Sequence, residues 1–587
     1  MGLGKVISAS TLKASVIVYD LRLPTGAYIE LQHPVSAVLA QVTELDRTEK
    51  GETARLDILG HASGRVEIPP DIGAEIRYAD NPLIREVLGV QRKSTTGLYM
   101  GKLYGHDIRV FVHYPSLINQ HVAVIAKTGG GKCLDGSTLV LLDNGLEVPI
   151  KDIEKYPDAE VVCLNKNLKI VTAPRTALTS RSAEHILRIK LLSGRILKLT
   201  PEHPVLLSNG MWCEARKLNK GDKLTTLDAW DFVVNIEEVD GKFTVYDIGV
   251  PTHHNFVADG VIVHNSYTVG VMVEELMKRD IPIVVIDPHG EYTAASFQND
   301  NAKDLSRMEE FGVIPHGYYD RIVEYSPDTE TNKLAQPLRF DERNFDVEDI
   351  LAISTIDSES QKSMLERAMY MCRRYQEQTT FANLIGILER ERSQSKYRLI
   401  SELQRLQTMP MFQDIPTKFH NIVRKRGMTI INLKGCAEDI QCAVAARIAK
   451  RIYTEAKHGT IPPCFLIVEE AHNFIPEMTR TIASKPITII AQEGRKFGVG
   501  LCVVSQRTAR VSKNVLAQCG SFIIHKLTNT DDLKAVSESL EGFTTQMTEE
   551  VQRLPIGVAL ISTIGLPHPI IVRIRPRESK HGGVSKT

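Results

Sequence analysis

The chain has 587 residues, of which 43% are hydrophobic and 24% charged, as in ordinary soluble globular proteins with several domains. Lys and Arg total 71 and so do Asp and Glu, so the net charge is zero and gives no argument for nucleic-acid binding. The nine cysteines include no Cys-x-x-Cys pair, which argues against a zinc site or a disulfide framework. No apolar run reaches the roughly 18 residues of a membrane span and the start lacks a signal-peptide core, so we expect a cytoplasmic protein with no membrane partner.

Residues 1–85 are expected to form a small β-barrel. Apolar and polar residues alternate in short runs such as 14–19 and 37–42, and turn residues at 24–26 and 69–70 separate the runs. Short strands at this spacing are typical of small barrels.

An α/β pattern follows and is interrupted. Residues 121–126 form an apolar run typical of a buried parallel strand, but residues 133–265 consist of short alternating segments joined by turns, which predicts an all-β domain. The α/β pattern resumes at Ser266 with an expected helix over 269–278 and a core strand over 283–287. We therefore predict an α/β core (86–132, 266–345 and 426–578), an inserted all-β domain (133–265), a helical insertion (346–425) and a disordered tail (579–587).

Removing residues 133–265 restores a phosphate-binding loop, because Lys132 is then followed by Ser266. Glycines let backbone N–H groups wrap the phosphates, the lysine contacts the β- and γ-phosphates, and the serine ligates Mg²⁺. The alternative is a Gly-rich hairpin beside an unrelated domain, and Ala126 replaces the usual opening glycine. The expected cofactors are ATP and Mg²⁺, and the expected nucleotide-binding residues are Lys127, Thr128, Gly129, Gly130, Gly131, Lys132, Ser266 and Tyr267.

The junctions of the removed block carry the chemistry of peptide-bond rearrangement. The Cys133 thiol can attack the carbonyl of Lys132 to form a thioester, and the Ser266 hydroxyl can take over that acyl group. Asn265 can then cyclise and cleave its own peptide bond, with the imidazole of His264 beside it to assist. Each step therefore has its residue at a junction.

The block resembles the intein family over essentially its whole length. The matching segments are 133–140, 199–205, 245–248, 254–260 and 263–266. The resemblance implies a Hint-type all-β fold in which Thr200 and His203 polarise the amide before Cys133, with Asp247 and His254 in the same active site. Taken singly, Thr200 and His203 would be interpreted as a turn and a polar contact. No motif pair typical of a homing endonuclease is present, so the resemblance is to a mini-intein.

Two carboxylates follow another expected core strand. Residues 464–468 are apolar, and Glu469 and Glu470 come next, at the end of the strand where ligands gather in α/β sheets. Hydrolysis of ATP needs one carboxylate near Mg²⁺ and one that orients or deprotonates the attacking water. We assign Glu469 to the metal and Glu470 to the water, with a solvated strand cap as the alternative.

Other polar residues lie at expected strand ends. Gln506 is a candidate sensor of the γ-phosphate, and Arg495 and Arg507 are candidate arginine fingers that reach the nucleotide of a neighbouring subunit, with surface salt bridges as the alternative. Asp287 and Glu291 follow the second core strand, either at the same sheet edge or in a simple structural turn. The same two interpretations, a charge that reaches a neighbouring nucleotide or a surface salt bridge, apply to Lys496, Arg573, Arg575 and Arg577.

Outside the block, the chain resembles the archaeal HerA helicases, which belong with the FtsK-type hexameric translocases. The resemblance is carried by the barrel and by segments 121–126, 286–292, 468–472 and 493–498. It implies a hexameric ring of RecA-like P-loop ATPase cores that moves along double-stranded DNA, with a NurA-type nuclease as partner in double-strand break end resection.

Two other functions stay open. One is a related ATPase motor for macromolecule transfer, and the other is a nucleotide-gated scaffold that recruits a nuclease. The sequence contains no helix-turn-helix or zinc-finger motif, although tracking along a DNA backbone needs none. Before splicing, the chain is expected not to hydrolyse ATP, because Ser266 is separated from Lys132 by a whole domain.

Overall fold

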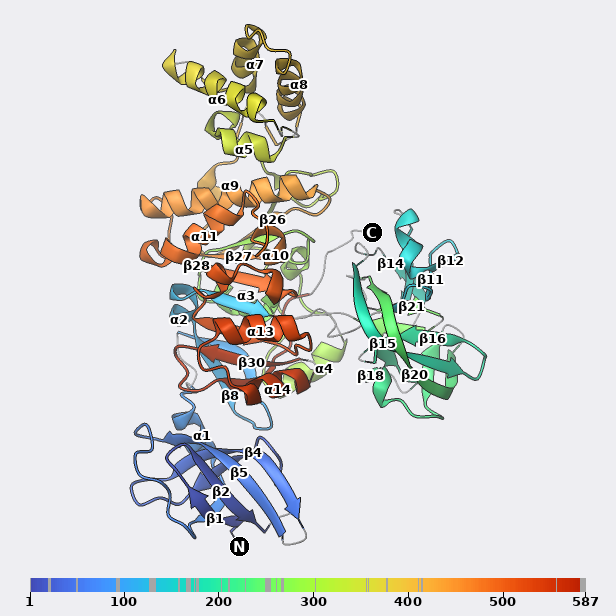
Figure 1. Cartoon of the computed structure of the whole chain (residues 1–587), viewed down its shortest axis with the longest axis vertical. Helices are drawn as coiled ribbons and strands as arrows, with labels where there is room; N and C mark the ends of the chain where they lie inside the picture. Colours follow the sequence, from blue (N-terminus) through green and yellow to red (C-terminus); the bar gives the residue numbers. More distant parts are fainter. Residues whose placement is uncertain are drawn as a thin grey trace. The chain divides into compact units, whose positions relative to one another are not determined.

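The structure is a computed structural model of the whole chain (Figure 1). It describes residues 2–580 except 20–22, 49–50, 91–95, 126–133, 157–158, 165–169, 174, 176–178, 202, 209–211, 227–228, 249–254, 260, 265–268, 301, 355, 357, 376–377, 410, 413–414 and 556. The chain divides into two compact units. The first comprises Met1–Leu117, Gly520–Ile524 and Pro555–Arg575, and the second comprises Ile118–Cys519, His525–Leu554 and Pro576–Thr587.

The first unit begins with a closed β-barrel. Its strands, in order around the barrel, are β1 (Gly4–Ala9), β2 (Lys13–Val18), β5 (Gly51–His61), β4 (Val38–Thr48), β3 (Tyr28–Leu31) and β6 (Glu75–Tyr78). Ala14, Val16 and Val18 of β2 are buried in the barrel core, while Lys13 before them and Ile17 between Val16 and Val18 are exposed. This alternation fills the interior of a small barrel, and the prediction of a β-barrel is confirmed.

A run of antiparallel strands also belongs to this unit. These strands are β29 (Ser521–Ile524), β30 (Val558–Thr563), β31 (Ile570–Ile574), β7 (Gly97–Leu103) and β8 (Arg109–His113), and the neighbouring helices are α1 (Asn81–Val87) and α2 (Tyr114–Asn119). Arg575 follows β31 and is fully buried, and its Nε donates a hydrogen bond to the carbonyl of Tyr99 at 3.0 Å. Segments from both ends of the chain therefore build one sheet.

The second unit contains the predicted α/β core with a parallel sheet. Its strands are, in order, β25 (Gln336–Pro337), β24 (Ile322–Ser326), β26 (Met428–Asn432), β23 (Ile283–Asp287), β27 (Cys464–Val468), β28 (Val499–Ser505) and β9 (Val122–Ile125). Every residue of β23, β27 and β28 is buried. Strands covered on both faces need such continuous apolar sequences, which is why the pattern identified them.

Helices pack around this sheet. They are α3 (Val269–Met277), α4 (Ala302–Phe311), α9 (Glu438–Lys457), α10 (Ala471–Phe474), α11 (Ser484–Glu493), α12 (Lys513–Leu516), α13 (Thr530–Ser539) and α14 (Thr545–Arg553). Helices α9 and α11 lie side by side, and both contact β28 (Figure 1). Val444, Ile448 and Ile452 of α9 are buried at four-residue spacing, as on the apolar face of an amphipathic helix.

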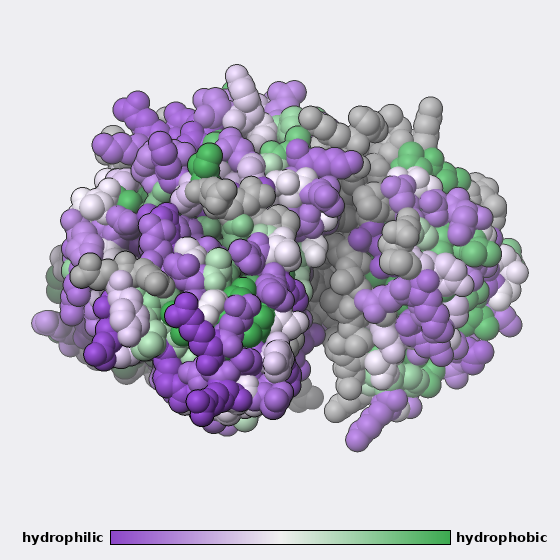
Figure 2. Space-filling view, turned by 90° about the horizontal axis from the view of Figure 1, so that it is seen from above, coloured by the Kyte–Doolittle hydropathy of each residue, from purple (hydrophilic) through white to green (hydrophobic). Residues whose placement is uncertain are grey.

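The helices α5 (Val347–Ala352), α6 (Glu359–Arg374), α7 (Phe381–Glu389) and α8 (Lys396–Gln407) all lie within residues 346–425. Helix α8 buries Leu399, Leu403 and Leu406, which form one helical face. The surface of these helices that is visible from above is mainly hydrophilic (Figure 2). The insertion therefore has a small apolar interior and a solvated exterior.

Residues 134–264 form an all-β body. Its strands are β10 (Leu134–Asp135), β11 (Leu139–Leu141), β12 (Glu147–Pro149), β13 (Val161–Leu164), β14 (Ile170–Ala173), β15 (Thr179–Leu191), β16 (Ile196–Leu199), β17 (Pro204–Leu206), β18 (Trp212–Glu214), β19 (Lys223–Thr226), β20 (Ala229–Asp247), β21 (Asn255–Ala258) and β22 (Val261–His264). The described residues of its main hydrophobic core all lie between Leu134 and Ala258. A segment with its own core is an independent domain inserted into the host sequence.

The expectation of disorder from residue 579 is wrong at its first residue. Ser579 is fully buried, and its hydroxyl donates a hydrogen bond to Glu274 of α3 at 2.6 Å. Residues 581–587 lie outside the described residues. Among the helices that the structure describes, none is both long and apolar enough to cross a lipid bilayer.

Candidate functional site

The candidate nucleotide site lies at the carboxyl edge of the parallel sheet. Strand β28 lies between β9 and β27, and all three run parallel, so the residues that follow them share one edge. Strand β9 ends at Ile125, before the expected phosphate loop, and α3 begins at Val269, after it. The loop residues themselves, Lys127 to Lys132 with Ser266 and Tyr267, lie outside the described residues. The strand and the helix on either side of the loop are therefore in place.

Glu470 directly follows this edge and has a left-handed backbone conformation, with φ of 46°. For a residue with a side chain this conformation costs about 1–3 kcal/mol, so the surrounding structure must impose it. The side-chain amide of Gln506 donates a short hydrogen bond to Oε1 of Glu470. Oε2 is buried and accepts no hydrogen bond from the described residues, although Nδ1 of His472 lies 3.2 Å away. One oxygen is thus anchored, and the other is available as an acceptor.

His472 lies against the same carboxylate. Its Nδ1 is 3.2 Å from Oε2 of Glu470 and 3.2 Å from the hydroxyl of Ser505. Burial, together with the charges of Arg507 and Arg510, lowers the pKa of His472 to about 4. The ring is therefore neutral near pH 7 and does not act as a counter-ion to Glu470.

Glu469 contacts a tyrosine that follows the neighbouring strand. The hydroxyl of Tyr292 donates a short hydrogen bond to Oε1 of Glu469, and only 4% of Tyr292 is exposed. Burial and the nearby carboxylates of Glu291 and Glu470 raise the pKa of Glu469 well above its usual value. Carboxylates this close make one another harder to ionise, and a cation would relieve that repulsion.

The segment after β23 is a turn built on Asp287. Asp287 is fully buried, and its two oxygens accept hydrogen bonds from the N–H groups of Gly290 at 2.8 Å and Tyr292 at 3.1 Å. Gly290 has φ of 72°, which glycine adopts without strain. Of the two interpretations left open by the sequence, the structural turn therefore describes Asp287.

Glu291 of this turn lies near the same edge. Glu291 is exposed, yet desolvation and the charge of Asp287 raise the pKa of its carboxyl group to about 7. The charge of Arg577 opposes the shift. Burial likewise raises the pKa of Glu470 to about 7. The edge therefore gathers carboxyl groups whose mutual repulsion a divalent cation would relieve.

The residues present fit Mg²⁺ that enters with a nucleotide. Within the described part of the chain, no group of three metal-ligating side chains comes together, so a cage made by protein alone is not indicated. Both oxygens of Asp287 are occupied by backbone N–H groups, so Asp287 is a poor metal ligand, whereas Glu469 and Glu291 remain as carboxylates at this edge. Mg²⁺ is usually held by few protein ligands together with phosphate oxygens and water.

The two candidate arginine fingers lie at opposite edges of the sheet. Arg507 follows Gln506 at the carboxyl edge. It is close enough to Glu470 for its positive charge to oppose the rise in the pKa of that carboxyl group. Arg495 lies in the short helix Gly494–Phe497, before β28 and thus at the amino edge, where its Nη2 donates to the carbonyl of Gln518 at 3.2 Å. Within one subunit the structure therefore brings Arg507, and not Arg495, to Glu470.

Two arginines near the C-terminus fit neither of the roles that the sequence suggested for them. Arg575 and Arg577 are buried, with 0% and 3% exposed, so neither surface salt bridging nor reaching a neighbour describes them. Nε of Arg577 lies 3.6 Å from Oε1 of Glu274, and Glu274 accepts the N–H groups of Glu578 at 3.1 Å and Ser579 at 2.8 Å. The C-terminal segment therefore holds α3, the helix that follows the phosphate loop.

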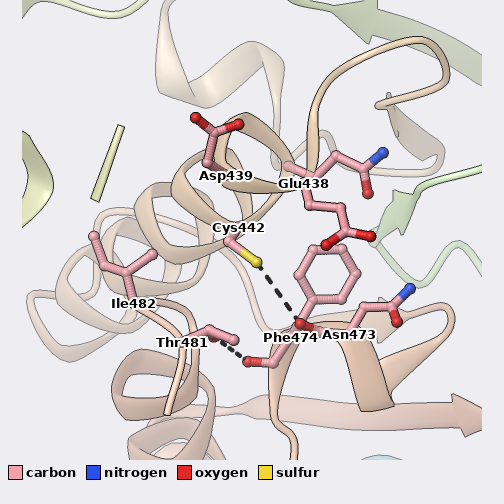
Figure 3. Close-up of a pocket in the computed structure, with 8 residues that line it drawn as sticks. Glu438, Asp439, Cys442, Asn473, Phe474, Thr481 and Ile482 are labelled. Atoms are coloured by element: carbon pink, nitrogen blue, oxygen red, sulfur yellow. Dashed lines mark hydrogen bonds between the residues drawn. The ribbon is translucent and has the colours of Figure 1, made fainter. Parts of the chain in front are cut away.

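A cavity of about 310 Å³ lies between the start of α9 and the segment after Glu470 (Figure 3). Cys442 lines it, and its Sγ donates to the carbonyl of Asn473 at 3.7 Å. Burial raises the pKa of Cys442 to about 11, so its thiol is not a nucleophile near neutral pH. Neither Glu469 nor Glu470 lines this cavity, which is therefore separate from the carboxylate site.

The candidate splicing centre is partly described. Thr200 and His203 are 2% and 1% exposed, and the N–H of His203 donates to the carbonyl of Thr200 at 2.9 Å. Asp247 ends β20 and His264 ends β22. The other expected splicing residues, Cys133, His254, Asn265 and Ser266, lie outside the described residues.

Strand pairing brings the start of the inserted domain beside these residues. Leu134, which follows Cys133, pairs with Leu199, which precedes Thr200. Leu134 also pairs with Tyr246, which precedes Asp247. The first strand of the domain therefore runs between the strands that lead to Thr200 and Asp247.

Two family models match this chain. One, described as "Helicase HerA, central domain", covers residues 266–452, and the other, "Helicase HerA-like C-terminal", covers residues 455–587. Together they include more than half of the sequence and the whole carboxylate cluster around Glu469. The chain belongs to the HerA helicase family. The resemblance predicted from the motifs is thereby confirmed.

Curated HerA-type relatives are similar over part of their length. A probable helicase of Methanocaldococcus jannaschii is 27% identical over 343 residues, which are 54% of this chain and 61% of that protein. The DNA double-strand break repair helicase HerA of Sulfolobus acidocaldarius is 33% identical over 170 residues, 28% of this chain and 34% of that protein. The DNA double-strand break repair helicase HerA of Saccharolobus solfataricus is 25% identical over 349 residues, which are 54% of this chain and 62% of that protein. The chain spans less than two thirds of the length of each of these relatives.

Solved intein structures are also similar to part of the chain. The DnaB intein from Synechocystis sp. PCC 6803 is 30% identical, with coverage of 23% of this chain and 99% of that one and a TM-score of 0.22. The PabCDC21-1 intein is also 30% identical, with coverage of 23% and 99% and a TM-score of 0.21.

Sequence reasoning did not identify every side chain of the carboxylate site. Tyr292 and His472 lie within quoted motifs, but nothing in the spacing indicates which carboxylate each contacts. The Glu274–Arg577 pair joins α3 to the C-terminal segment. The two adjacent glutamates in the otherwise apolar helix Val269–Met277 were the available signal for buried ion pairs.

Proposed function

We propose that this HerA-type chain, after removal of the inserted domain, is a Mg²⁺-dependent ATPase in which Glu470 acts on the attacking water. The observation that carries the proposal is the state of the Glu470 carboxylate. Gln506 anchors one oxygen, and the other is buried and accepts no hydrogen bond from the described residues. A general base must keep its position and retain an acceptor for water, and these two oxygens meet those requirements.

The proposed division of labour follows from the positions of the residues. Glu470 aligns the water and accepts its proton as the water oxygen bonds to the γ-phosphorus and the bond to ADP breaks. Mg²⁺ supplies charge neutralisation on the phosphates. Glu469 serves the metal side, Gln506 holds Glu470 and is a candidate sensor of the γ-phosphate, and Lys132 and Ser266 complete the site as the sequence predicts.

The test is Glu470→Gln in the spliced protein. This change removes the base but keeps the size of the side chain, so ATP hydrolysis should fall by about 100-fold or more while nucleotide binding persists. Glu549→Gln, on α14 and with 61% of its side chain exposed, is the matched control and should retain full activity. Hydrolysis by Glu470→Gln at the rate of the control would contradict the assignment of the base.

We further infer that hydrolysis drives movement along double-stranded DNA. Three supports are the HerA family match, the barrel that precedes the core, and the printed names of two relatives as DNA double-strand break repair helicases. The proposed assembly is a hexamer in which Arg495 reaches the nucleotide of the neighbouring subunit. Its exposure at the edge opposite Glu470 suits a role in trans. The proposed partner is a NurA-type nuclease that resects broken ends.

Linear duplex DNA tests the substrate. ATP hydrolysis by the spliced protein should rise severalfold when duplex is added, and Arg495→Ala should abolish hydrolysis without preventing nucleotide binding. Hydrolysis that ignores DNA would favour the alternative of a motor for another macromolecule. Full stimulation of the nuclease by Glu470→Gln would favour the nucleotide-gated scaffold.

We also propose that residues 133–265 excise themselves by protein splicing. The supports are the separate core of the inserted domain, the flanking β9 and α3 of the host, and the pairing of Leu134 between the strands that lead to Thr200 and Asp247. In the proposed reaction Cys133, His264, Asn265 and Ser266 act at the junctions, while Thr200, His203, Asp247 and His254 assist. The product joins Lys132 to Ser266 and so completes the phosphate loop.

Intact mass tests the splicing. Expression of the wild-type sequence should yield the ligated protein and the free inserted domain, whereas Cys133→Ala combined with Asn265→Ala should leave the 587-residue chain. Cys163→Ala is the control, because this buried thiol has its pKa raised to about 12 and takes no part in the proposed reaction. A ligated product from the double variant would overturn the proposal.

A further inference from the structure

The turn after β23 connects two strand ends through one tyrosine. The N–H of Tyr292 donates to Asp287, and its hydroxyl donates to Glu469, which follows the adjacent strand β27. Asp287 is fully buried, and Tyr292 is 4% exposed. The turn after β23 therefore fixes the position of the tyrosine hydroxyl, and the carboxylate that follows β27 accepts its hydrogen bond.

Glu469 needs such a partner because its other neighbours repel it. Asp287, Glu291 and Glu470 all act on Glu469 as negative charges. A buried carboxylate surrounded by other carboxylates rotates away from them or takes up a proton unless a donor holds it. Among the described residues, Tyr292 supplies the hydrogen bond that the structure shows to Glu469.

We propose that Tyr292 is a positioning residue that orients the Glu469 carboxylate for Mg²⁺ through its hydroxyl. This inference rests on the proposed ATPase function and adds a residue that acts through Glu469 without touching the nucleotide. Loss of the hydroxyl leaves the ring packing intact but lets the carboxylate turn. The site then takes up Mg²⁺ less readily, and turnover falls more than the affinity for nucleotide does.

The experiment compares Tyr292→Phe with Tyr318→Phe in the spliced protein. Tyr318 is a matched control because it is also buried and its hydroxyl also donates to a carboxylate, that of Glu578 at 2.9 Å. Binding of a fluorescent ATP analogue is measured while Mg²⁺ is titrated, alongside kcat, KM and the thermal midpoint. The half-saturating Mg²⁺ concentration should rise about ten-fold or more for Tyr292→Phe, the usual effect of losing one hydrogen bond to a charged group, and stay unchanged for Tyr318→Phe. The kcat should fall in Tyr292→Phe with KM for ATP nearly constant.

A double-mutant cycle separates positioning from packing. If Tyr292 acts through Glu469, then Tyr292→Phe should have little further effect on the Mg²⁺ titration in a Glu469→Gln background. Equal Mg²⁺ requirements in the two Phe variants, a lower requirement in Tyr292→Phe, or additive effects in the cycle would each overturn the proposal. A wild-type protein that hydrolyses no ATP would instead overturn the proposed function, and the Mg²⁺ titration would still decide the role of Tyr292.

Discussion

Glu274→Gln should destabilise the core strongly although it conserves the shape of the side chain. Glu274 is fully buried, and its oxygens accept two backbone N–H groups and one hydroxyl from Glu578 and Ser579. The same carboxylate lies 3.6 Å from Nε of Arg577, which is 3% exposed. The substitution places an NH₂ group against a donor and leaves the guanidinium without its counter-ion.

The expected loss is about 3–5 kcal/mol, the usual effect of removing one partner from a buried ion pair. At roughly 2–4 °C per kcal/mol for a unit of this size, the unfolding midpoint of the core should fall by about 10 °C. Circular dichroism during heating measures the shift. Glu549→Gln, whose side chain is 61% exposed and 4.0 Å from Arg553, is the control and should change the midpoint by no more than about 2 °C.

A second variant tests the cause. Arg577→Met should restore part of the loss in the Glu274→Gln background, because it removes the charge that the first change left unpaired. A midpoint for Glu274→Gln equal to that of the exposed control would refute the role of this pair. Simple addition of the two losses in the double variant would refute the ionic coupling between Glu274 and Arg577.

The remaining predictions concern the inserted domain and the first unit. Burial raises the pKa of Asp259 to about 6, above the value of about 3.9 in unfolded chains, so its stabilising effect is present below about pH 4 and is lost as the pH rises through 6. The inserted domain, in the Cys133→Ala, Asn265→Ala chain, should therefore melt at a lower temperature at pH 7 than at pH 5, and Asp259→Asn should reduce this difference; an unchanged difference would contradict the reasoning. Gly101→Ala should destabilise the first unit by at least about 2 kcal/mol in denaturant, because Gly101 has φ of 152° and a Cβ there would collide with the carbonyl of Arg573. Gly386→Ala, in a helix with open space around it, should be neutral or stabilising, and equal effects of the two alanines would exclude the steric cause.

Much of the fold was predictable because local pattern and burial coincide in it. Residues 464–468 form one apolar run and 122–125 lie in another, and both of these segments are buried parallel strands whose ends must meet at one edge. The alternation around Val16 likewise predicts the barrel. The position of Glu470 after such a strand was enough to make it a candidate for water activation.

The splice junctions were readable for a different reason. Each step of the proposed reaction needs one kind of side chain at one bond, so Cys133, Asn265 and Ser266 are marked by their position in the chain alone. The pairing of Leu134 with Leu199 could not be predicted from the sequence, because it depends on which strands the inserted domain brings together.

The sequence by itself determined the order of domains, the buried strands, the interrupted phosphate loop and the carboxylates that follow β27. Only the tertiary structure decided that the hydroxyl of Tyr292 donates to Glu469 and that Arg577 is buried against Glu274. The physical reason is the separation along the chain of the residues that interact. Periodicity and junction chemistry act between neighbours in the chain, whereas these contacts join segments far apart in sequence, which become neighbours only once the sheet has placed its strands and α3 beside one another.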